Sequence, residues 1–202
     1  MERAELKQLA KSQIKGNIGI LFLIMLVLGL VAGVAGGIPV VGQIAGLLIT
    51  PALSLGLCKI YLDLTGGKKP AVGDLFSQIS NFWRAFKVTF LVGLFTSLWS
   101  LLFVIPGIVK GYSYSMAMYI LAENPEIGAR EAINRSKAMM EGHKMDLFVL
   151  YLSFIGWHLL GCITFGIAYI YITPYMSATV ANFYNSIKPV AEAPVEAAVE
   201  AE

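Results

Sequence analysis

Long apolar stretches alternate with short charged windows along the chain of 202 residues. Residues 16–58 and 147–187 contain no Asp, Glu, Lys or Arg, and residues 88–122 contain a single charged residue, Lys110. One membrane-crossing helix needs about 20 apolar residues, so each stretch is about long enough for two helices. The pattern therefore predicts an all-α, polytopic membrane helix bundle with six transmembrane helices arranged as three hairpins.

Glycine and proline residues divide each apolar stretch near its middle, where a helix is expected to end. The predicted turns lie near residues 36–39, 106–107 and 161–166. The predicted membrane helices are 18–36, 39–61, 88–105, 107–122, 147–163 and 166–186. The domain organisation is then an amphipathic cytoplasmic helix at 1–17, a membrane domain at 18–187 with cytoplasmic segments at about 63–87 and 123–146, and a disordered acidic cytoplasmic tail at 188–202.

Each charged window also places apolar residues at helical spacing, which predicts an amphipathic helix before each hairpin. The first window has an apolar face of Leu6, Leu9, Ala10 and Ile14. In the second, Asp74 is expected to cap a helix with an apolar stripe of Leu75, Phe76, Ile79, Phe82, Trp83 and Phe86. The third has a small-residue face of Ala129, Ala132, Ile133, Ser136 and Met140.

The composition supports a membrane location. Hydrophobic residues make up 57% of the chain and its mean hydropathy is +0.71, while charged residues make up only 14%, against about 25% in soluble proteins. No basic face stands clear of the apolar stretches, which argues against a nucleic-acid partner. Cys58 and Cys162 lie in apolar runs without metal-ligand spacing, so we expect packing thiols, no metal and no cofactor.

The charged windows also predict the topology. Lys and Arg accumulate in cytoplasmic loops, and three hairpins place all four basic windows on one side of the membrane. Both termini are therefore expected in the cytoplasm. The apolar run after the basic start continues well beyond Gly37, so we expect an uncleaved first helix rather than a signal peptide.

Two Thr-Pro steps in the apolar stretches are candidate functional sites. Each proline removes a backbone donor and frees the carbonyl four residues earlier. Such carbonyls line ion or substrate sites in broken transporter helices, and the alternative is a simple kink. The similar spacing of the two steps also suggests an internal duplication. The residues concerned are Leu47, Thr50, Pro51, Ile170, Thr173 and Pro174.

Two further sets of residues carry candidate chemistry. His158 lies within a predicted membrane helix, where an ionisable side chain is a functional candidate, although no membrane carboxylate accompanies it for a proton relay. A neutral, hydrogen-bonded histidine is the alternative. Four basic residues recur along the first amphipathic helix and suit contact with anionic lipid, or simple anchoring of the topology; they are Arg3, Lys7, Lys11 and Lys15.

Several motifs of this chain resemble a bacterial integral-membrane family catalogued as domain of unknown function 975. The motifs lie at residues 11–17, 106–117, 136–144, 152–157 and 173–175. The resemblance covers roughly residues 1–187. It implies a multi-helix protein of the bacterial inner membrane and brings no established activity and no catalytic residues.

Taken together, these features predict a multipass inner-membrane protein that is not an enzyme and acts through protein or lipid partners on the cytoplasmic side. No nucleophile–base pair is recognisable in the sequence. The first alternative is a transporter or permease for a small or amphiphilic solute, which the Thr-Pro steps suggest. The second is a lipid-modifying membrane enzyme. The oligomeric state does not follow from the sequence.

Overall fold

The computed structural model describes residues 3–38, 41–102 and 104–188, and every regular element in these ranges is helical, which confirms the all-α prediction. The α-helices are α1 (Arg3–Ile14), α2 (Ile18–Gly37), α3 (Val41–Thr65), α4 (Phe82–Leu102), α5 (Val104–Tyr114), α6 (Ala117–Glu123), α7 (Ala129–Met139), α8 (Lys144–Leu152), α9 (Ile155–Ile163) and α10 (Tyr169–Ile187). Two short 3₁₀ helices precede α4, η1 (Val72–Phe76) and η2 (Ile79–Asn81). The predicted acidic tail lies outside the described residues, apart from Lys188.

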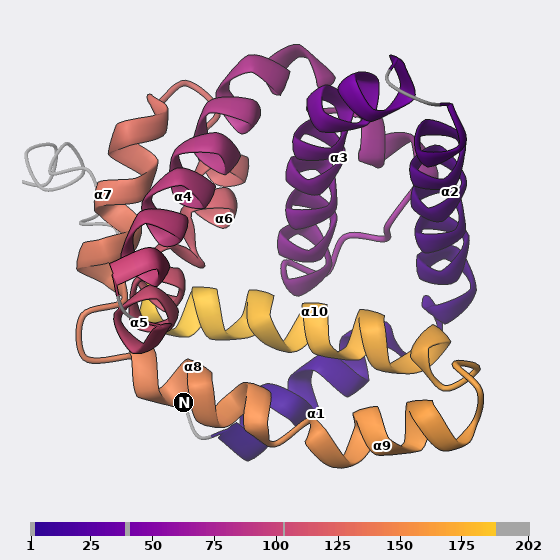
Figure 1. Ribbon diagram of the computed structural model, residues 1–202. Coiled ribbons are helices and arrows are strands. Elements are labelled where there is room, and N and C mark those ends of the chain that lie inside the picture. Colours follow the sequence, from indigo (N-terminus) through magenta and orange to yellow (C-terminus); the bar gives the residue numbers. More distant parts are fainter. Residues whose placement is uncertain (1–2, 39–40, 103, 189–202) are drawn as a thin grey trace, which may run out of the picture.

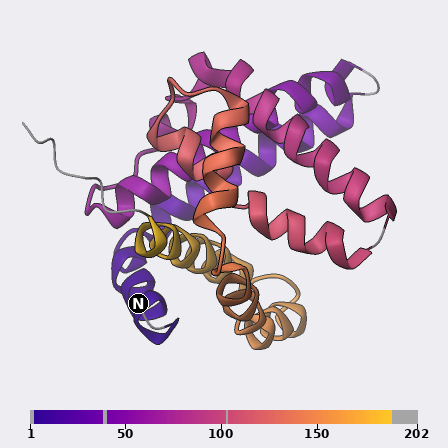
Figure 2. The ribbon, with the colours of Figure 1, turned by 90° about the vertical axis from the view of Figure 1, so that its left-hand side faces the viewer.

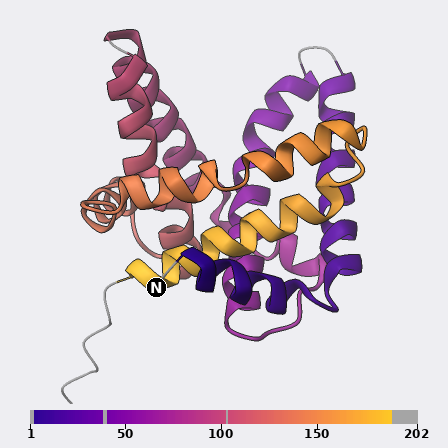
Figure 3. The ribbon, with the colours of Figure 1, turned by 90° about the horizontal axis from the view of Figure 1, so that it is seen from below.

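Three helical hairpins branch from a common packed region (Figure 1). The first hairpin pairs α2 with α3 and the second pairs α4 with α5. The third consists of α8, α9 and α10, with α9 packed against α10. Figure 2 shows the second hairpin extending to the right, where the far end of the first hairpin also lies. Figure 3 shows the turns of the first two hairpins at the top and the N-terminus towards the bottom. The hairpins therefore diverge instead of forming one parallel bundle.

The packed region, here called the base, contains α1, η1, α6, α7 and the adjoining ends of the hairpin helices. Two clusters of buried apolar side chains hold it together, one centred on α6 and α7 and the other on α1, α3 and α10. The hairpin ends around the turns are here called the tips. They comprise residues 30–38, 41–49, 98–102, 104–109 and 159–170.

Helix α1 has the amphipathic character predicted for it. Leu6, Ala10 and Ile14 are buried, whereas Leu9 is partly exposed. Gly16, with a φ of +86°, then allows a sharp turn, and α2 leaves α1 at 89°. A reciprocal amide pair ties α1 to α10, since Asn182 donates to Gln13 Oε1 at 2.6 Å and Gln13 donates to Asn182 Oδ1 at 3.2 Å.

The predicted helix around Asp74 is replaced by η1, η2 and an earlier start of α4. Asp74 does not occupy the N-cap position, and its carboxylate accepts the Ala71 N–H at 3.0 Å from inside η1. The segment packs tightly on α3, because a Cβ on Gly56 would overlap the backbone carbonyl of Leu75. This segment is therefore held by close packing against α3, and it does not form the single helix with one apolar stripe that the sequence predicts.

The predicted helix at 107–122 is interrupted between α5 and α6. Ser113 and Ser115 in this stretch bond the backbone carbonyls of Val109 and Tyr112, and such local bonds compete with the helical pattern. Ser136 of α7 stabilises the interruption: its hydroxyl donates to the Ser113 carbonyl at 2.9 Å and accepts the Met116 N–H at 3.2 Å. The predicted small-residue face of α7 is buried as expected.

The second and third hairpins also differ from the predicted helix ends. The turn expected at residues 106–107 lies inside α5, where Gly107 packs against Ser100 of α4. The helix expected at 147–163 is interrupted at Ser153 and Phe154, where the Ser153 hydroxyl bonds the Leu150 carbonyl. This second interruption lies where α1 contacts the third hairpin.

Membrane-capable helices are present among the described residues. Two segments are long and apolar enough to cross a bilayer, namely Ala45–Thr65 and Lys144–Ile163, the second of which runs through α8 and α9. A third candidate is the bent pair of Arg3–Ile14 and Ile18–Val34. By length and composition, the structure therefore has two or three candidate crossings.

Candidate membrane interface

Burial changes sharply along each hairpin, from a packed base to an open tip. In the second hairpin Ala85 and Val88 are fully buried, whereas Leu101 is 87% exposed. In the third, Leu147 is fully buried and Phe165 is 98% exposed. Further strongly exposed tip residues are aliphatic, namely Leu30, Val34, Leu47, Ile105, Ile108, Leu159, Ile163 and Ile167.

The exposed tips carry no charged residue; the nearest charge is Lys110, one residue beyond the second tip. Its ammonium lies 5.0 Å from the ring centroid of Trp99. Monomeric soluble proteins rarely expose contiguous apolar patches of more than a few hundred Å², and larger patches mark sites of interaction with a membrane or another protein. The tips therefore form a candidate surface for an apolar environment.

Lysine side chains lie over aromatic rings near the base of the second and third hairpins. Aromatic and basic residues typically gather at membrane–water boundaries, where an amphipathic side chain has both an apolar and a polar neighbour. The pairs are Lys7 with Phe154, Lys11 with Tyr175, Lys87 with Trp83 and Lys137 with Tyr114, at 4.4 to 5.8 Å between the Nζ atom and the ring centroid. They are candidates for the level at which a membrane surface would meet the protein.

The four basic residues predicted to contact anionic lipid occupy different surroundings. Lys7 donates to the Ser153 carbonyl at 3.1 Å, and burial together with the neighbouring charge of Lys11 lowers its pKa. Arg3 lines a polar groove with His143 and Asp146, which are themselves 3.2 Å apart. Lys15 is exposed just after α1. Lys7 and Lys11 therefore help to attach α1 to the third hairpin.

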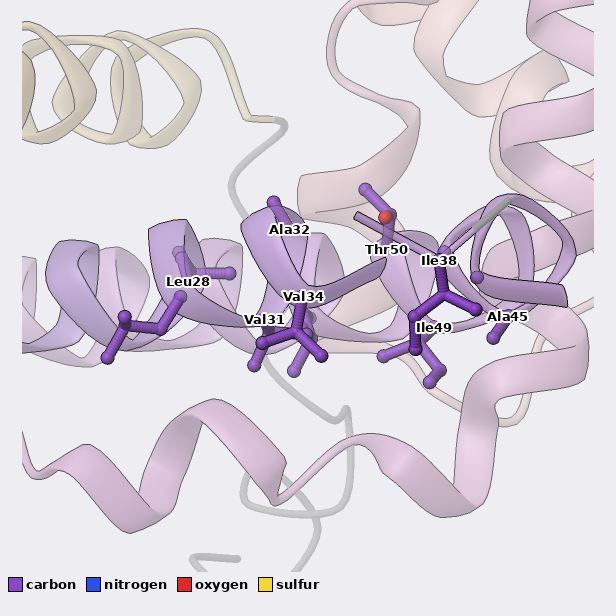
Figure 4. A pocket seen from close by; sticks show the side chains of 12 residues that line it. Leu28, Val31, Ala32, Val34, Ile38, Ala45, Ile49 and Thr50 are labelled. Atoms are coloured by element: carbon purple, nitrogen blue, oxygen red, sulfur yellow. The ribbon is translucent and has the colours of Figure 1, made fainter. Parts of the chain in front are cut away.

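The two Thr-Pro steps lie in separate hairpins. Pro51 is inside α3 and Pro174 inside α10, and both rings are buried. Thr50 contributes the single polar side chain of a groove of about 430 Å³ between α2 and α3, whose labelled lining residues come from both helices in Figure 4. Its lining residues are Leu28, Leu30, Val31, Ala32, Val34, Ile38, Gly42, Ala45, Gly46, Ile49, Thr50 and Leu53.

The partners of the second Thr-Pro step line a different groove. Ile170 and Thr173 lie with Phe22, Met25 and Tyr169 in a shallow groove of about 290 Å³ between α2 and the third hairpin. Leu47 is largely exposed at the first tip. The structure thus places Thr50 and Thr173 in two different grooves, and neither of these grooves contains both threonines.

His158 has a neighbouring hydroxyl as its partner. Its Nδ1 atom lies 3.2 Å from the Tyr169 hydroxyl, which links α9 to the start of α10. The described residues contain no group of three His, Cys, Asp or Glu side chains arranged to hold a metal ion. The contacts of His158 favour an interhelical hydrogen bond within the third hairpin.

A polar cluster in the base was not anticipated from the sequence. The Glu123 carboxylate accepts the Tyr184 hydroxyl at 2.7 Å and forms an ion pair with Lys188. Burial raises the pKa of Glu123, but the hydrogen bonds from Lys188 and Tyr184 and the charges of Lys188 and Lys59 outweigh it, so the pKa is lowered. In the sequence, Glu123 and Lys188 are each the first charged residue after an apolar stretch. This position does not indicate that the two side chains form a pair.

Comparison with known proteins identifies the family of the chain. A family model described as protein of unknown function (DUF975) matches residues 1–113 and 101–191. The chain therefore belongs to this family, which confirms the resemblance found in its motifs. No curated protein and no solved structure matches the chain. The family description names no activity.

Proposed function

We propose that this member of the DUF975 family is a multipass protein of the bacterial inner membrane, with its three hairpins embedded in the bilayer and its base on the cytoplasmic side. It acts without catalysis, through protein or lipid partners at the base. The observation that supports this proposal is the change from buried base to exposed, uncharged tip in all three hairpins. Other parts of the protein do not cover the tips, and lipid acyl chains would provide the apolar surroundings instead.

A lipid environment fits the tips better than a single protein partner. The tips belong to three separate hairpins (Figure 3). Exposed aliphatic side chains occur on all three of them. One partner surface would have to cover three separate projections, whereas a bilayer surrounds each of them equally. Helices also satisfy their own backbone hydrogen bonds, which makes them suited to the hydrocarbon region.

The base is the part of the molecule suited to polar partners. The ion pairs between described residues lie there, including Lys59 with Asp63 at 3.4 Å and Glu131 with Arg135 at 2.6 Å. Lysine and arginine residues mark the cytoplasmic side of membrane proteins, so we place the base in the cytoplasm. The proposal assigns no catalytic residue, no metal and no cofactor.

The finer proposal of six crossings depends on the length of each helix. At about 1.5 Å per residue, α2, α3 and α4 are each about 30 Å long or longer, which matches a hydrocarbon layer of about 30 Å. By the same measure α5 is about 16 Å long and needs α6 to complete a crossing. The two Thr-Pro steps line separate grooves, so we propose no transport function.

The test of this proposal is to locate the charged loops relative to the membrane. Alkaline phosphatase or a fluorescent protein that folds only in the cytoplasm is fused after Lys69 or after Lys144. We expect fluorescence and no phosphatase activity at both positions, and we expect the intact protein to stay with the membrane in alkaline carbonate. Phosphatase activity at either position would overturn the proposed orientation, and release by carbonate would overturn the membrane assignment.

A further inference from the structure

The third hairpin has an outgoing leg, α8 and α9, and a returning leg, α10. Charged groups pack against the middle of the outgoing leg, a feature that the described part of the first hairpin lacks. The Lys7 ammonium donates to the Ser153 carbonyl at 3.1 Å, where α8 gives way to α9, and lies 4.4 Å from the Phe154 ring centroid. The Lys11 ammonium lies 5.6 Å from the Tyr175 ring centroid on the returning leg. Helix α1 thus places two cations against the third hairpin, both close to the junction between α8 and α9.

These cations restrict how deeply the hairpin can enter a bilayer. If Lys144–Ile163 crossed as one unit, Ser153 would lie about 14 Å from its start, close to the middle of a hydrocarbon layer of about 30 Å. Neither Lys7 nor Lys11 has an ion-pair partner among the described residues. Placing a lysine at the bilayer centre disfavours insertion roughly a hundredfold for each residue.

The burial of α10, the returning leg, limits the depth of the hairpin in the bilayer at the same place. From Tyr175 onwards α10 is packed inside the base and carries the buried polar residues Thr179 and Asn182. Only its first residues stand beside α9, and they contribute Tyr169 and Ile170 to the exposed tip.

An aromatic cluster lies where the hairpin leaves the base. The ring centroids of Phe154 and Tyr175 are 5.1 Å apart, and Trp157 lies 5.8 Å from Tyr175 and 6.0 Å from Tyr171. Tryptophan and tyrosine are enriched at the level of lipid headgroups. With Lys7 and Lys11 beside them, these rings have the composition of a membrane–water boundary.

Beyond this level the hairpin is short and uncharged. Helix α9 has 9 residues, or about 14 Å, which is about half of the hydrocarbon thickness. The turn that follows holds Phe165 at a φ of 52° with its side chain 98% exposed. The left-handed conformation is unfavourable for a phenylalanine, and an exposed ring adds a further cost in water, which acyl chains would remove.

We propose that the third hairpin is re-entrant: α9, its turn and the start of α10 enter only the leaflet next to the base and return to the same side. Their partner is the acyl chains of that leaflet, with Lys7 and Lys11 at the level of its phosphates. This inference rests on the proposed membrane location. It changes the predicted six crossings to four, because in the described parts of the first two hairpins no such cations lie at the middle of the outgoing helices α2 and α4.

Cys162, one residue before the end of α9, provides a natural reporter of depth, since it is exposed at the tip. The full-length protein with Cys58→Ala is labelled with bimane at Cys162 and reconstituted in vesicles of phosphatidylcholine and phosphatidylglycerol. Lipids carrying a nitroxide at the headgroup or at successive acyl positions then quench the probe. We expect the strongest quenching from the nitroxide nearest the bilayer centre, and no reaction of unlabelled Cys162 with an impermeant maleimide from either side.

The matched control is Gly37→Cys in a Cys58→Ala, Cys162→Ser background, which reports the tip of the first hairpin. Gly37 has open space around it, and we expect this probe at the headgroups of the opposite leaflet. Headgroup quenching of the Cys162 probe, with maleimide reaction from the side opposite the base, would overturn the re-entrant hairpin alone. A Cys162 probe that no lipid nitroxide quenches would overturn the membrane location itself.

A second reporter covers the case in which Cys58→Ala does not fold. Trp157 becomes the single tryptophan in Trp83→Phe, Trp99→Phe, and lipids brominated at different depths replace the nitroxides. A re-entrant hairpin places Trp157 near the headgroups of the leaflet next to the base, so shallow bromines should quench it most strongly. Strongest quenching by bromines near the bilayer centre would contradict the proposal, because it would put the aromatic cluster in the middle of the membrane.

Discussion

The base and the tips are both rich in apolar residues, but the surroundings of these residues differ. In the base, side chains such as Ala132 and Phe154 are fully enclosed by other parts of the chain. In the tips, side chains such as Leu101 and Phe165 have almost no protein around them. Sequence hydrophobicity is therefore equal evidence for a core and for a lipid-facing surface, and only the packing separates the two.

Two phenylalanines at opposite ends of α9 should show the largest contrast. Phe154 is fully buried, so Phe154→Ala should lower the free energy of unfolding by about 3–5 kcal/mol. Phe165→Ala at the exposed turn should change it by less than about 0.5 kcal/mol. Thermal and denaturant unfolding in one detergent measures both. Equal losses would mean that the tip is packed in the folded protein.

A glycine pair tests the tight packing of the base next. A Cβ at Gly56 would overlap the Leu75 backbone, so Gly56→Ala should destabilise the protein by about 3 kcal/mol and displace η1. The control is Gly93→Ala in α4, where a Cβ meets open space. Because alanine favours helix, this variant should gain up to about 1 kcal/mol. A Gly56→Ala protein as stable as the control would contradict the close contact of α3 with η1.

The interruption between α5 and α6 gives a smaller effect. Ser136→Ala leaves the Ser113 carbonyl and the Met116 N–H without their buried partner, so we expect a loss of about 2 kcal/mol. Ser115→Ala serves as the control, because among the described residues that hydroxyl bonds only the nearby Tyr112 carbonyl and forms no hydrogen bond with α7. Denaturant unfolding of both variants measures the difference. If the two variants lose the same stability, the bridge by Ser136 is not needed for the interruption.

The smallest effect concerns the polar cluster of Glu123. Its folded-state pKa is lowered, so the carboxylate contributes stability above its unfolded pKa, and this contribution is lost as the pH falls through the folded value. Since the cluster is partly exposed, we expect about 1 kcal/mol or less. Melting temperatures at about pH 7 and about pH 4 should differ more for the natural protein than for Glu123→Gln. An unchanged pH dependence in the variant would exclude the cluster as its source.

The predictable parts of the fold are those with a repeated local pattern. The apolar face of α1 and the small-residue face of α7 recur at helical spacing. The face of α7 is buried as predicted, and so is that of α1 except for Leu9, which is exposed. The interruption at Ser153 has no such pattern, because the cation that accompanies it, Lys7, is far away in the sequence. The pairing of Glu123 with Lys188 is likewise set by the meeting of α6 and α10.

The candidate site shows the same limit. Charge spacing places Lys7 and Lys11 on one face of a helix, which correctly brings them together. It cannot show that Phe154 and Tyr175 lie beneath them, since those rings belong to the distant third hairpin. The similar spacing of the two Thr-Pro steps suggests an internal duplication, but it does not show that α3 and α10 present the two threonines to different grooves. Tertiary packing decides both outcomes.

The contact of the tips with lipid is tested most directly by Trp99, which lies in the second tip and is partly exposed. Trp99 becomes the single tryptophan in Trp83→Phe, Trp157→Phe, and the protein is reconstituted in vesicles. We predict that lipids brominated on their acyl chains quench its fluorescence and that iodide in the surrounding water does not. Quenching by iodide with no effect of the brominated lipids would contradict a membrane-embedded tip.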